Sequence, residues 1–549
     1  MTNNMDSRVI ELLLRYVKAH THTGTALENN NMGFFKDWFE EVSYLQDHPQ
    51  QCGFYPVKND PLSRQICYAL LKGRGKKTIV MIHHTDTVDT EDFGKHQDLA
   101  YEPDQLAKFF ESGEIILDPE SEQDLRSGEW LFGRGVSDMK AGGSIHLAIF
   151  EEYARQTMMA GNLIILGVPD EENSSAGMRS AVYLLQELKE KYDLEYSLML
   201  NGEPHERSDE AKITVYDGSA GKIMPVVYVR GKLAHVGQVF KGLNPIAVLS
   251  EIVGRTDLNP AFIEKSGNTA TLPPSWLYFK DNKAVYDVSL PLSAGGYMSV
   301  LTLYKNPDAI MEEIKTIARE AFVHVLRRAR QSLAAYEALG TQDYGKMEWD
   351  PLVLHFGELV EAVAMEKGQG FRQGIAGFTE EIAERVGANE FSRMEGSMLL
   401  IEKVLENWSY KDPVVVLAIS PPYYPATSNT MLPNGEKITE FIGHLAEYSK
   451  GETGLDIQVQ NYFTGISDLS YAMFNGDDAA IKYISENMLL WGKSYTVPLA
   501  EIREIAMPVL NLGPWGKDLH KSTERVRLED LLFRIPALTK FTIDELLKD

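Results

Sequence analysis

Cysteine is scarce in this sequence. Its 549 residues include only Cys52 and Cys67, and the two do not form a CxxC pair. A disulfide framework and a metal knuckle made of thiolates are therefore excluded as organising features. Any metal ion in this protein would have to be held by histidine and carboxylate side chains.

Long apolar runs are also missing. No uninterrupted run approaches the roughly 20 residues that span a bilayer, so we expect no membrane partner. The opening stretch, MTNNMDSRVIELLLRYVKAH, mixes acidic with apolar residues and lacks the apolar core and cleavage site of a signal peptide. It predicts an amphipathic helix, and we expect the protein to be cytoplasmic.

Basic charge is in deficit. Lysine and arginine total 54 against 79 aspartate and glutamate residues, which gives a net charge of -25 at pH 7. This balance disfavours nucleic acid and anionic membranes as partners. The composition, 44% apolar and 24% charged, is that of a globular protein, and the length predicts two or more domains.

Three short apolar segments each lead into a histidine or an acid. The segments are 78–82 before His84, 163–168 before Glu171 and Glu172, and 198–200 before Glu203. A further acid, Asp138, precedes an amphipathic segment that starts near Ala141. Apolar runs of this length, with helical segments between them, predict an α/β fold whose central strands are mostly parallel and whose strand ends carry a site.

One imidazole and several carboxylates at strand ends form the ligand set that a zinc or cobalt site uses when no thiolate is present. The adjacent acids Glu171 and Glu172 repel each other unless a cation or a shared proton relieves them. In a metal site, one of them can bind the ion while the other acts as a base. Taken singly, each of these residues is more often a helix cap or a solvated loop residue.

Several stretches, in this order, resemble the signatures of the M20 family of metallopeptidases and aminoacylases. They are HHTDTVD, GRGVSDMKAG, PDEENSSAG, NGEP, RGKLAHVG, GLNPI and GISD. The resemblance extends from the amino-terminal helix to GPWGKDLHKSTERV. The length of the chain and the segment SPPYYPATSN, residues 420–429, most resemble the arginine-utilisation branch called RocB-like proteins.

The resemblance implies two divalent metal ions per chain, with zinc favoured and cobalt or manganese as alternatives. The implied ligands are Asp138 as the bridge, His84 and Glu203 at one ion, and Glu172 and His520 at the other.

Four further residues receive roles by the same resemblance. Glu171 would be the general base, and Asp86 would accept the second N–H of the ligand histidine. His235 would stabilise the oxyanion, from its own chain or from the other subunit of a dimer, although a structural role for this histidine is equally compatible with the sequence. Asn244 would contact substrate, although asparagine before proline is also a common turn.

The implied architecture is a zinc-peptidase-like catalytic domain with an inserted α+β, ferredoxin-like lid, which in the family usually forms the dimer. We place the catalytic domain at residues 1–212 and 341–549 and the lid at 213–340, with lid strands expected at 284–293 and 297–305. The chain departs from the family in one respect, because no acid followed by an arginine is visible on a lid strand to bind a substrate carboxylate.

These observations predict a metal-dependent hydrolase that cleaves an amide bond of a small peptide or N-acyl amino acid. A place in arginine or amino-acid catabolism and a homodimer are compatible with the resemblance. The alternative is a binding protein that keeps this scaffold without catalysis. All the implied ligands and Glu171 are present, so the sequence itself offers no sign of lost activity.

Overall fold

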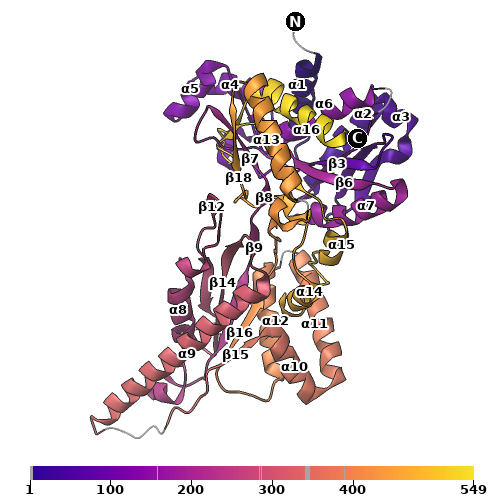
Figure 1. Cartoon of the computed structure of the whole chain (residues 1–549). Helices are drawn as coiled ribbons and strands as arrows, with labels where there is room; N and C mark the ends of the chain where they lie inside the picture. The colour runs from indigo at the N-terminus through magenta and orange to yellow at the C-terminus, as the bar shows by residue number, and fades with distance from the viewer. Residues whose placement is uncertain are drawn as a thin grey trace.

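The computed structural model describes residues 4–156, 159–283, 285, 287–340, 346–388, 390–433 and 435–548. Two lobes follow one another from top to bottom in Figure 1, and both chain ends lie in the upper lobe. Within the described residues, no helix is both long and apolar enough to cross a membrane.

The upper lobe contains an eight-stranded sheet with the order β1-β2-β5-β3-β6-β19-β7-β18. Strand β3 runs parallel to β5 and β6, and β6 runs parallel to β19, whereas β1, β2 and β5 pair antiparallel at one edge and β19 pairs antiparallel with β7. The strands are β1 Cys52–Pro56, β2 Gln65–Leu71, β3 Lys77–His84, β5 Asn162–Val168, β6 Glu195–Asn201, β7 Lys212–Tyr216, β18 Asp456–Gln460 and β19 Val509–Asn511. The three predicted apolar segments are therefore neighbouring strands of one sheet.

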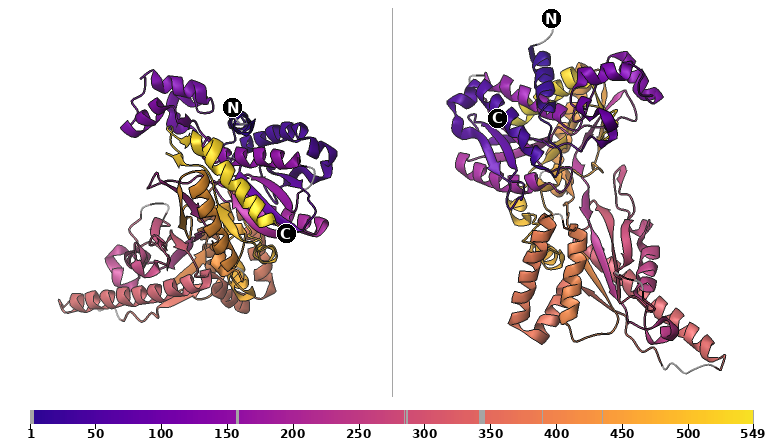
Figure 2. Two further views of the ribbon diagram at one scale, coloured as in Figure 1. Left: turned by 45° about the horizontal axis from the view of Figure 1, so that its top comes forward. Right: turned by 180° about the vertical axis from the view of Figure 1, so that it is seen from behind.

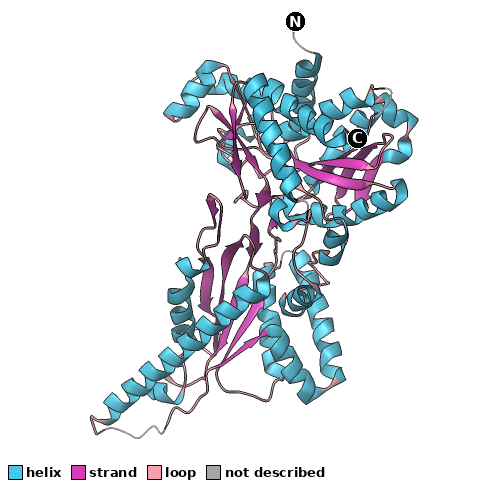
Figure 3. Cartoon of the chain, viewed as in Figure 1, coloured by secondary structure: helices cyan, strands magenta, loops and turns pink. Residues whose placement is uncertain are grey.

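Helices cover both faces of this sheet, as Figures 1 and 3 show. Ile79 and Met81 of β3 belong to the core shared with α1, α6 and α16, whereas Val80 and Ile82 belong to the core shared with α7. A strand buried on both faces needs apolar side chains at successive positions, which explains the continuous apolar run. The helices are α1 Asn4–Val17, α6 Lys140–Ala154, α7 Ala176–Tyr192, α13 Gly435–Glu452 and α16 Ile535–Leu547.

The lower lobe contains a second sheet with the order β13-β14-β10-β16-β15. Its elements are β10 Pro225–Arg230, α8 Pro245–Thr256, β13 Ser275–Asp281, β14 Ser293–Thr302, α9 Pro307–Glu337, β15 Leu352–His355, α10 Phe356–Lys367, α11 Gln369–Gly387, α12 Arg393–Asn407 and β16 Val414–Ile419. Val227 and Val229 of β10 pack toward α8 and α9, and Val226 and Tyr228 pack toward α10, α11 and α12. From β10 to α9 these elements follow the order β-α-β-β-α, which suits the expected α+β lid, and helices lie on both sides of the sheet in Figure 2.

Two features of the lower lobe differ from the expectation. Strand β16 pairs with β10, and β15 pairs with β16, so two strands within the range 341–549 that we assigned to the catalytic domain lie in the lower sheet. The segment 284–293 is not the second lid strand: residues 284 and 286 lie outside the described residues, 287–292 form no strand, and β13 precedes them. An apolar run such as that of β16 is compatible with either sheet, because the local sequence does not specify which strand it pairs with. We propose that the lid extends from β10 to β16.

Candidate metal centre

The carboxyl ends of three parallel strands meet at one edge of the upper sheet. Because β3 lies between β5 and β6, the residues that follow these strands come together. His84 is the last residue of β3, Glu171 and Glu172 follow β5, and Glu203 follows β6. Asp138 reaches the same place from the segment before α6.

Glycine allows the start of α6 to approach the end of β6. A Cβ atom added at Gly142 would lie 2.0 Å from the carbonyl oxygen of Gly202. A side chain there would push the helix and the strand end apart. The close approach therefore helps to bring Asp138 near Glu203.

The carboxylate of Asp138 lies between two histidines. Its Oδ1 is 2.8 Å from Nε2 of His84, and its Oδ2 is 3.1 Å from Nε2 of His520. His520 Nε2 also lies 3.2 Å from Oε1 of Glu172, and His84 Nε2 lies 3.8 Å from Oε1 of Glu203. One ligand atom each from His84, Asp138 and Glu172 lie within 4.8 Å of one another, a spacing that suits a metal ion. The five predicted ligands thus converge, although they come from five separate segments.

Asp86 contacts His84 through its backbone carbonyl oxygen, whereas we expected its carboxylate to do so. The second ring nitrogen of His84, Nδ1, lies 2.9 Å from the backbone carbonyl oxygen of Asp86, whereas the nearer carboxylate oxygen is 3.7 Å away. The carboxylate instead accepts hydrogen bonds from the backbone N–H groups of Glu171, at 3.1 Å, and Glu172, at 3.3 Å. A proton on Nδ1 would leave the Nε2 lone pair directed toward Asp138. Asp86 therefore connects the histidine to the loop that carries the two glutamates.

Carboxylates crowd this centre. Burial and the nearby charge of Asp138 together raise the pKa of Glu203 to about 7. Burial also raises the pKa of Glu171 well above its ordinary value. Hydrogen bonds to Asp138 and Glu172 raise the pKa of His520 to about 10. Several acids in so small a volume require positive charge or protons to offset their repulsion.

Asp468 adds another buried acid next to Glu171. Neither of its carboxylate oxygens meets hydrogen-bond geometry with any described residue, and burial raises the pKa of Asp468 to about 7. The preceding residue, Ser467, accepts a hydrogen bond from Nδ2 of Asn201 at 3.0 Å and caps the next turn through the N–H of Leu469 at 3.2 Å. The GISD turn is thus tied to the end of β6.

Glu524 supports the centre, and the sequence did not reveal this role. Its Oε1 accepts hydrogen bonds from the backbone N–H groups of Ser137 and Asp138, both at 3.1 Å. Its Oε2 lies 2.8 Å from Nη1 of Arg134 in an ion pair that is almost completely buried. Both residues occur inside the family-like stretches, but their pairing across the chain has no signature in the sequence.

Two predicted site residues lie away from this centre. His235 is exposed beyond the end of β10, and its Nδ1 accepts a hydrogen bond from the N–H of Gly237 at 3.1 Å. Asn244 caps α8 by accepting a hydrogen bond from the N–H of Ile246 at 3.0 Å. Both residues follow β10, a strand of the lower sheet, and Asn244 lies at the start of α8 in the same lobe. Within one chain, the structure does not bring them to the metal centre.

His83 points to the opposite face of β3 from His84. Its ring lies 6.0 Å from the ring of Phe35 and 5.8 Å from that of Tyr16, within the apolar core. Burial lowers the pKa of His83 well below its ordinary value. It is a neutral core side chain.

The mostly parallel sheet, the inserted second sheet and the His and carboxylate cluster at the strand ends are features of a two-domain metallohydrolase. The sequence matches the model of "Peptidase family M20/M25/M40" over residues 83–544, so the chain belongs to this family and is an M20-type metallopeptidase.

Relatives match almost the whole chain. It is 30% identical over 543 residues to protein YqjN of Bacillus subtilis, covering 98% of this chain and 96% of that protein. It is 28% identical over 560 residues to protein RocB of the same organism, covering 99% and 96%. Among solved structures, the di-peptidase Dug1p of Saccharomyces cerevisiae matches with a TM-score of 0.51 at 9% identity over 100% of both chains. A tripeptidase of Staphylococcus aureus matches with a TM-score of 0.50 at 11% identity, also over 100% of both chains. The structural matches confirm the predicted fold.

Proposed function

We propose that this protein hydrolyses an amide bond of a small peptide or an N-acyl amino acid at a centre that holds two divalent metal ions. The observation that carries the proposal is the position of Asp138, whose two carboxylate oxygens face two different histidines. One carboxylate placed in this way can bridge two ions, each completed by its own histidine and glutamate.

The residues present fit two metal ions. We assign His84 and Glu203 to one ion, and Glu172 and His520 to the other, with Asp138 shared. Oε1 of Glu172 is buried and lies 3.2 Å from Nε2 of His520, as expected of two donor atoms that share a cation. Nitrogen and oxygen donors without a thiolate suit zinc, with cobalt or manganese as alternatives. When bound, such ions supply Lewis acidity that makes water more acidic and polarises the scissile carbonyl.

Glu171 acts as the general base in this proposal. Its backbone N–H donates to Oδ1 of Asp86 at 3.1 Å, which fixes this residue in the loop after β5. The high pKa that burial imposes makes this carboxylate a good proton acceptor. Glu171 takes a proton from the attacking water and delivers it to the leaving nitrogen.

His235 stabilises the oxyanion from a second copy of the chain. It is exposed in the segment after β10 of the lower lobe, whereas the candidate metal ligands of its own chain follow strands of the upper lobe. Edge strand β13 gives the lid a surface for a partner: within the described chain it pairs only with β14, and Leu277 and Phe279 are 55% and 45% exposed. We therefore propose a homodimer formed through the lid, in which Asn244 contacts the substrate bound by the partner.

The physiological substrate belongs to arginine or amino-acid catabolism in this proposal. The similarity to protein RocB over 99% of the chain supports this assignment. A cytoplasmic location remains a prediction from the sequence.

Elemental analysis combined with an activity screen tests the function. The purified protein is analysed for bound metal and is assayed against dipeptides and N-acyl amino acids, with and without zinc, cobalt or manganese. Close to two ions per chain and metal-dependent turnover are expected. The absence of both after metal reconstitution would favour the alternative of a non-catalytic binding protein.

A further inference from the structure

A cavity of about 650 Å³ lies between the two lobes. Helix α7 and the loop 58–64 form its upper side, and α11, α12 and the loop 493–496 form its lower side. Among the described residues, neither Glu171 nor any of the five proposed metal ligands lines this cavity. The cavity is therefore a space apart from the reacting centre, and a ligand in it need not be the substrate.

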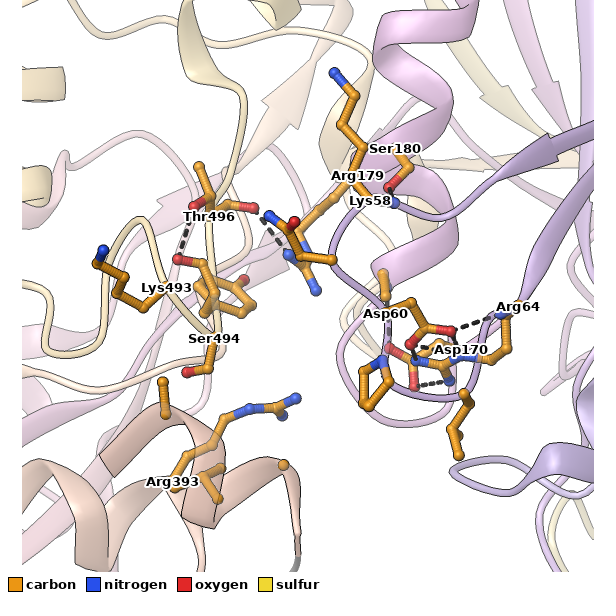
Figure 4. A pocket seen from close by; sticks show the side chains of 18 of the residues that line it. Lys58, Asp60, Arg64, Asp170, Arg179, Ser180, Arg393, Lys493, Ser494 and Thr496 are labelled. Atoms are coloured by element: carbon orange, nitrogen blue, oxygen red, sulfur yellow. Dashed lines mark hydrogen bonds and ion pairs between the residues drawn. The ribbon is translucent and has the colours of Figure 1, made fainter. Parts of the chain in front are cut away.

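Arg393, the first residue of α12, extends into this cavity from the lower lobe, as Figure 4 shows. Its Nε atom is buried and has no hydrogen-bond partner among the described residues. Burial lowers the pKa of Arg393 despite the attraction of the Asp170 carboxylate. A buried N–H group that has lost water without gaining an acceptor is costly. Arg393 therefore favours an anionic ligand in this cavity.

Arg179 of α7 faces the same cavity from the upper lobe. Its Nη1 donates to the carbonyl oxygen of Thr496 at 2.8 Å, and its Nε donates to that of Ser174 at 3.2 Å. Its guanidinium carbon lies 4.3 Å from the centroid of the Tyr495 ring. These contacts hold the guanidinium in place, but none of them supplies a full negative charge. Because the charge of Arg179 also lowers the pKa of Arg393, the two cations repel each other.

Ser494 supplies a third donor on the wall of the cavity. Its Oγ atom is buried and has no hydrogen-bond partner among the described residues. It lies in the loop 493–496, on the same side of the cavity as Arg393 in Figure 4. Buried hydroxyl and guanidinium groups normally have a partner. Here two unpartnered donors from separate segments line one space, so a single ligand can satisfy both.

The other charged groups around the cavity are engaged with protein partners or lie at its rim. Asp170 contacts Arg64 at 2.6 Å and accepts a hydrogen bond from Oγ of Ser174 at 2.7 Å. Asp60 contacts the same guanidinium at 2.8 Å. The remaining ones are Lys493 paired with Glu380, Lys58 over the ring of Tyr183, and the exposed Glu384. Among the described residues that line the cavity, Arg179 and Arg393 are thus the half-buried cations without a carboxylate contact.

We propose that Arg179, Arg393 and Ser494 bind the phosphate group of a small ligand, at a site between the two lobes and apart from the metal centre. The two guanidinium groups carry two positive charges, and a phosphate monoester carries about −1.5 to −2 at pH 7. A monocarboxylate would balance only one of the two cations. The three terminal oxygens of phosphate are strong acceptors, which matches three donor residues. The size of the cavity is typical of small-molecule sites, so it accommodates a phosphorylated metabolite as well as free phosphate.

Phosphorus NMR of inorganic phosphate, titrated with the full-length protein, tests this site. We expect the phosphate signal to broaden as protein is added, and Arg393→Ala should weaken the binding about tenfold or more. Acetate in large excess should not displace the phosphate. Competition by glycerol 3-phosphate identifies the source of the phosphate group. Tighter binding of this monoester would indicate a phosphorylated metabolite, whereas equal or weaker binding would indicate free phosphate.

Divalent metal ions also bind phosphate, so the titration is repeated after treatment of the protein with a chelator. The binding should be unchanged, because no proposed metal ligand lines the described cavity wall. Arg393→Lys keeps the positive charge without the fork and should give intermediate binding. Ser494→Ala should weaken binding about fivefold. Arg372→Ala removes an exposed arginine of α11 that pairs with Glu361, and should leave binding unchanged.

Thermal unfolding of each variant reports whether its fold is intact. No broadening with wild type, loss of binding after chelation, displacement by acetate, or unchanged binding in a folded Arg393→Ala protein would each overturn the phosphate site. If Arg393→Ala does not fold, unchanged binding in both Arg393→Lys and Ser494→Ala would overturn it instead. None of these measurements involves hydrolysis, so the phosphate site and the proposed hydrolytic function stand or fall separately.

Discussion

Glu524 accepts a hydrogen bond from the backbone N–H of Asp138 at 3.1 Å, across 386 positions of the chain. The same carboxylate binds Arg134, so one buried acid fixes both the backbone of Asp138 and the loop before it. This contact ties the last part of the chain to the metal centre.

Replacing Glu524 with alanine should destabilise the protein by about 3–5 kcal/mol, because Arg134 would keep a buried charge without its partner. Metal affinity should fall about 10- to 100-fold, since Asp138 would lose its support. Urea unfolding of the metal-free protein and competition with a metal chelator measure the two effects. Glu529→Ala, which breaks the half-exposed pair with Arg534, should cost less than about 1 kcal/mol. Equal costs for the two variants would show that Glu524 has no special role.

Replacing Glu171 with glutamine should abolish hydrolysis while the protein still binds its metals. The amide keeps the size of the side chain but cannot accept the proton of water. Initial rates and elemental analysis of the same preparation test this prediction. Glu190→Gln changes an exposed acid of α7 and should preserve activity. Hydrolysis by Glu171→Gln at the wild-type rate would remove Glu171 from its proposed role.

Mixed dimers should reveal whether His235 acts in the partner's site. His235→Ala and Glu171→Gln should each be nearly inactive alone. In a hybrid dimer, one site combines Glu171 of one subunit with His235 of the other and is therefore complete. Random assembly after co-expression should restore about a quarter of wild-type activity, because half of the dimers are hybrids with one working site each. If His235 acts within its own chain, the mixed dimers should recover no activity. A monomer found by sedimentation would contradict the proposed dimer.

His146 should make the folded state sensitive to acid. Burial lowers the pKa of His146 from 6.5 to about 3, so the folded protein keeps this side chain neutral while the unfolded chain takes up a proton below pH 6.5. Stability is therefore lost as the pH falls from 6.5 toward 3. Between pH 7.5 and 5.5, this residue alone should cost about 1.4 kcal/mol. Chemical unfolding at the two pH values measures the free energy of unfolding. Between pH 7.5 and 5.5 this free energy should fall by about 1.4 kcal/mol less in His146→Leu than in wild type. Equal losses in the two proteins would refute the effect.

The sequence alone predicted three central strands of the catalytic lobe and the candidate ligands at their ends. Apolar runs such as 78–82 are local, and each ends within a few residues of its functional side chain, so His84, Glu172 and Glu203 follow from strand order. The resemblance to a family then assigned His520 and Asp138, which no local pattern connects.

Only the tertiary structure decided which sheet receives β16, which part of Asp86 contacts the histidine, and where Arg393 points. Each of these depends on contacts between residues far apart in sequence or on the choice between backbone and side-chain atoms. A single apolar strand pairs equally well with many partners, and a lone arginine on a helix resembles any solvated charge. Their roles arise from the partners that folding places beside them.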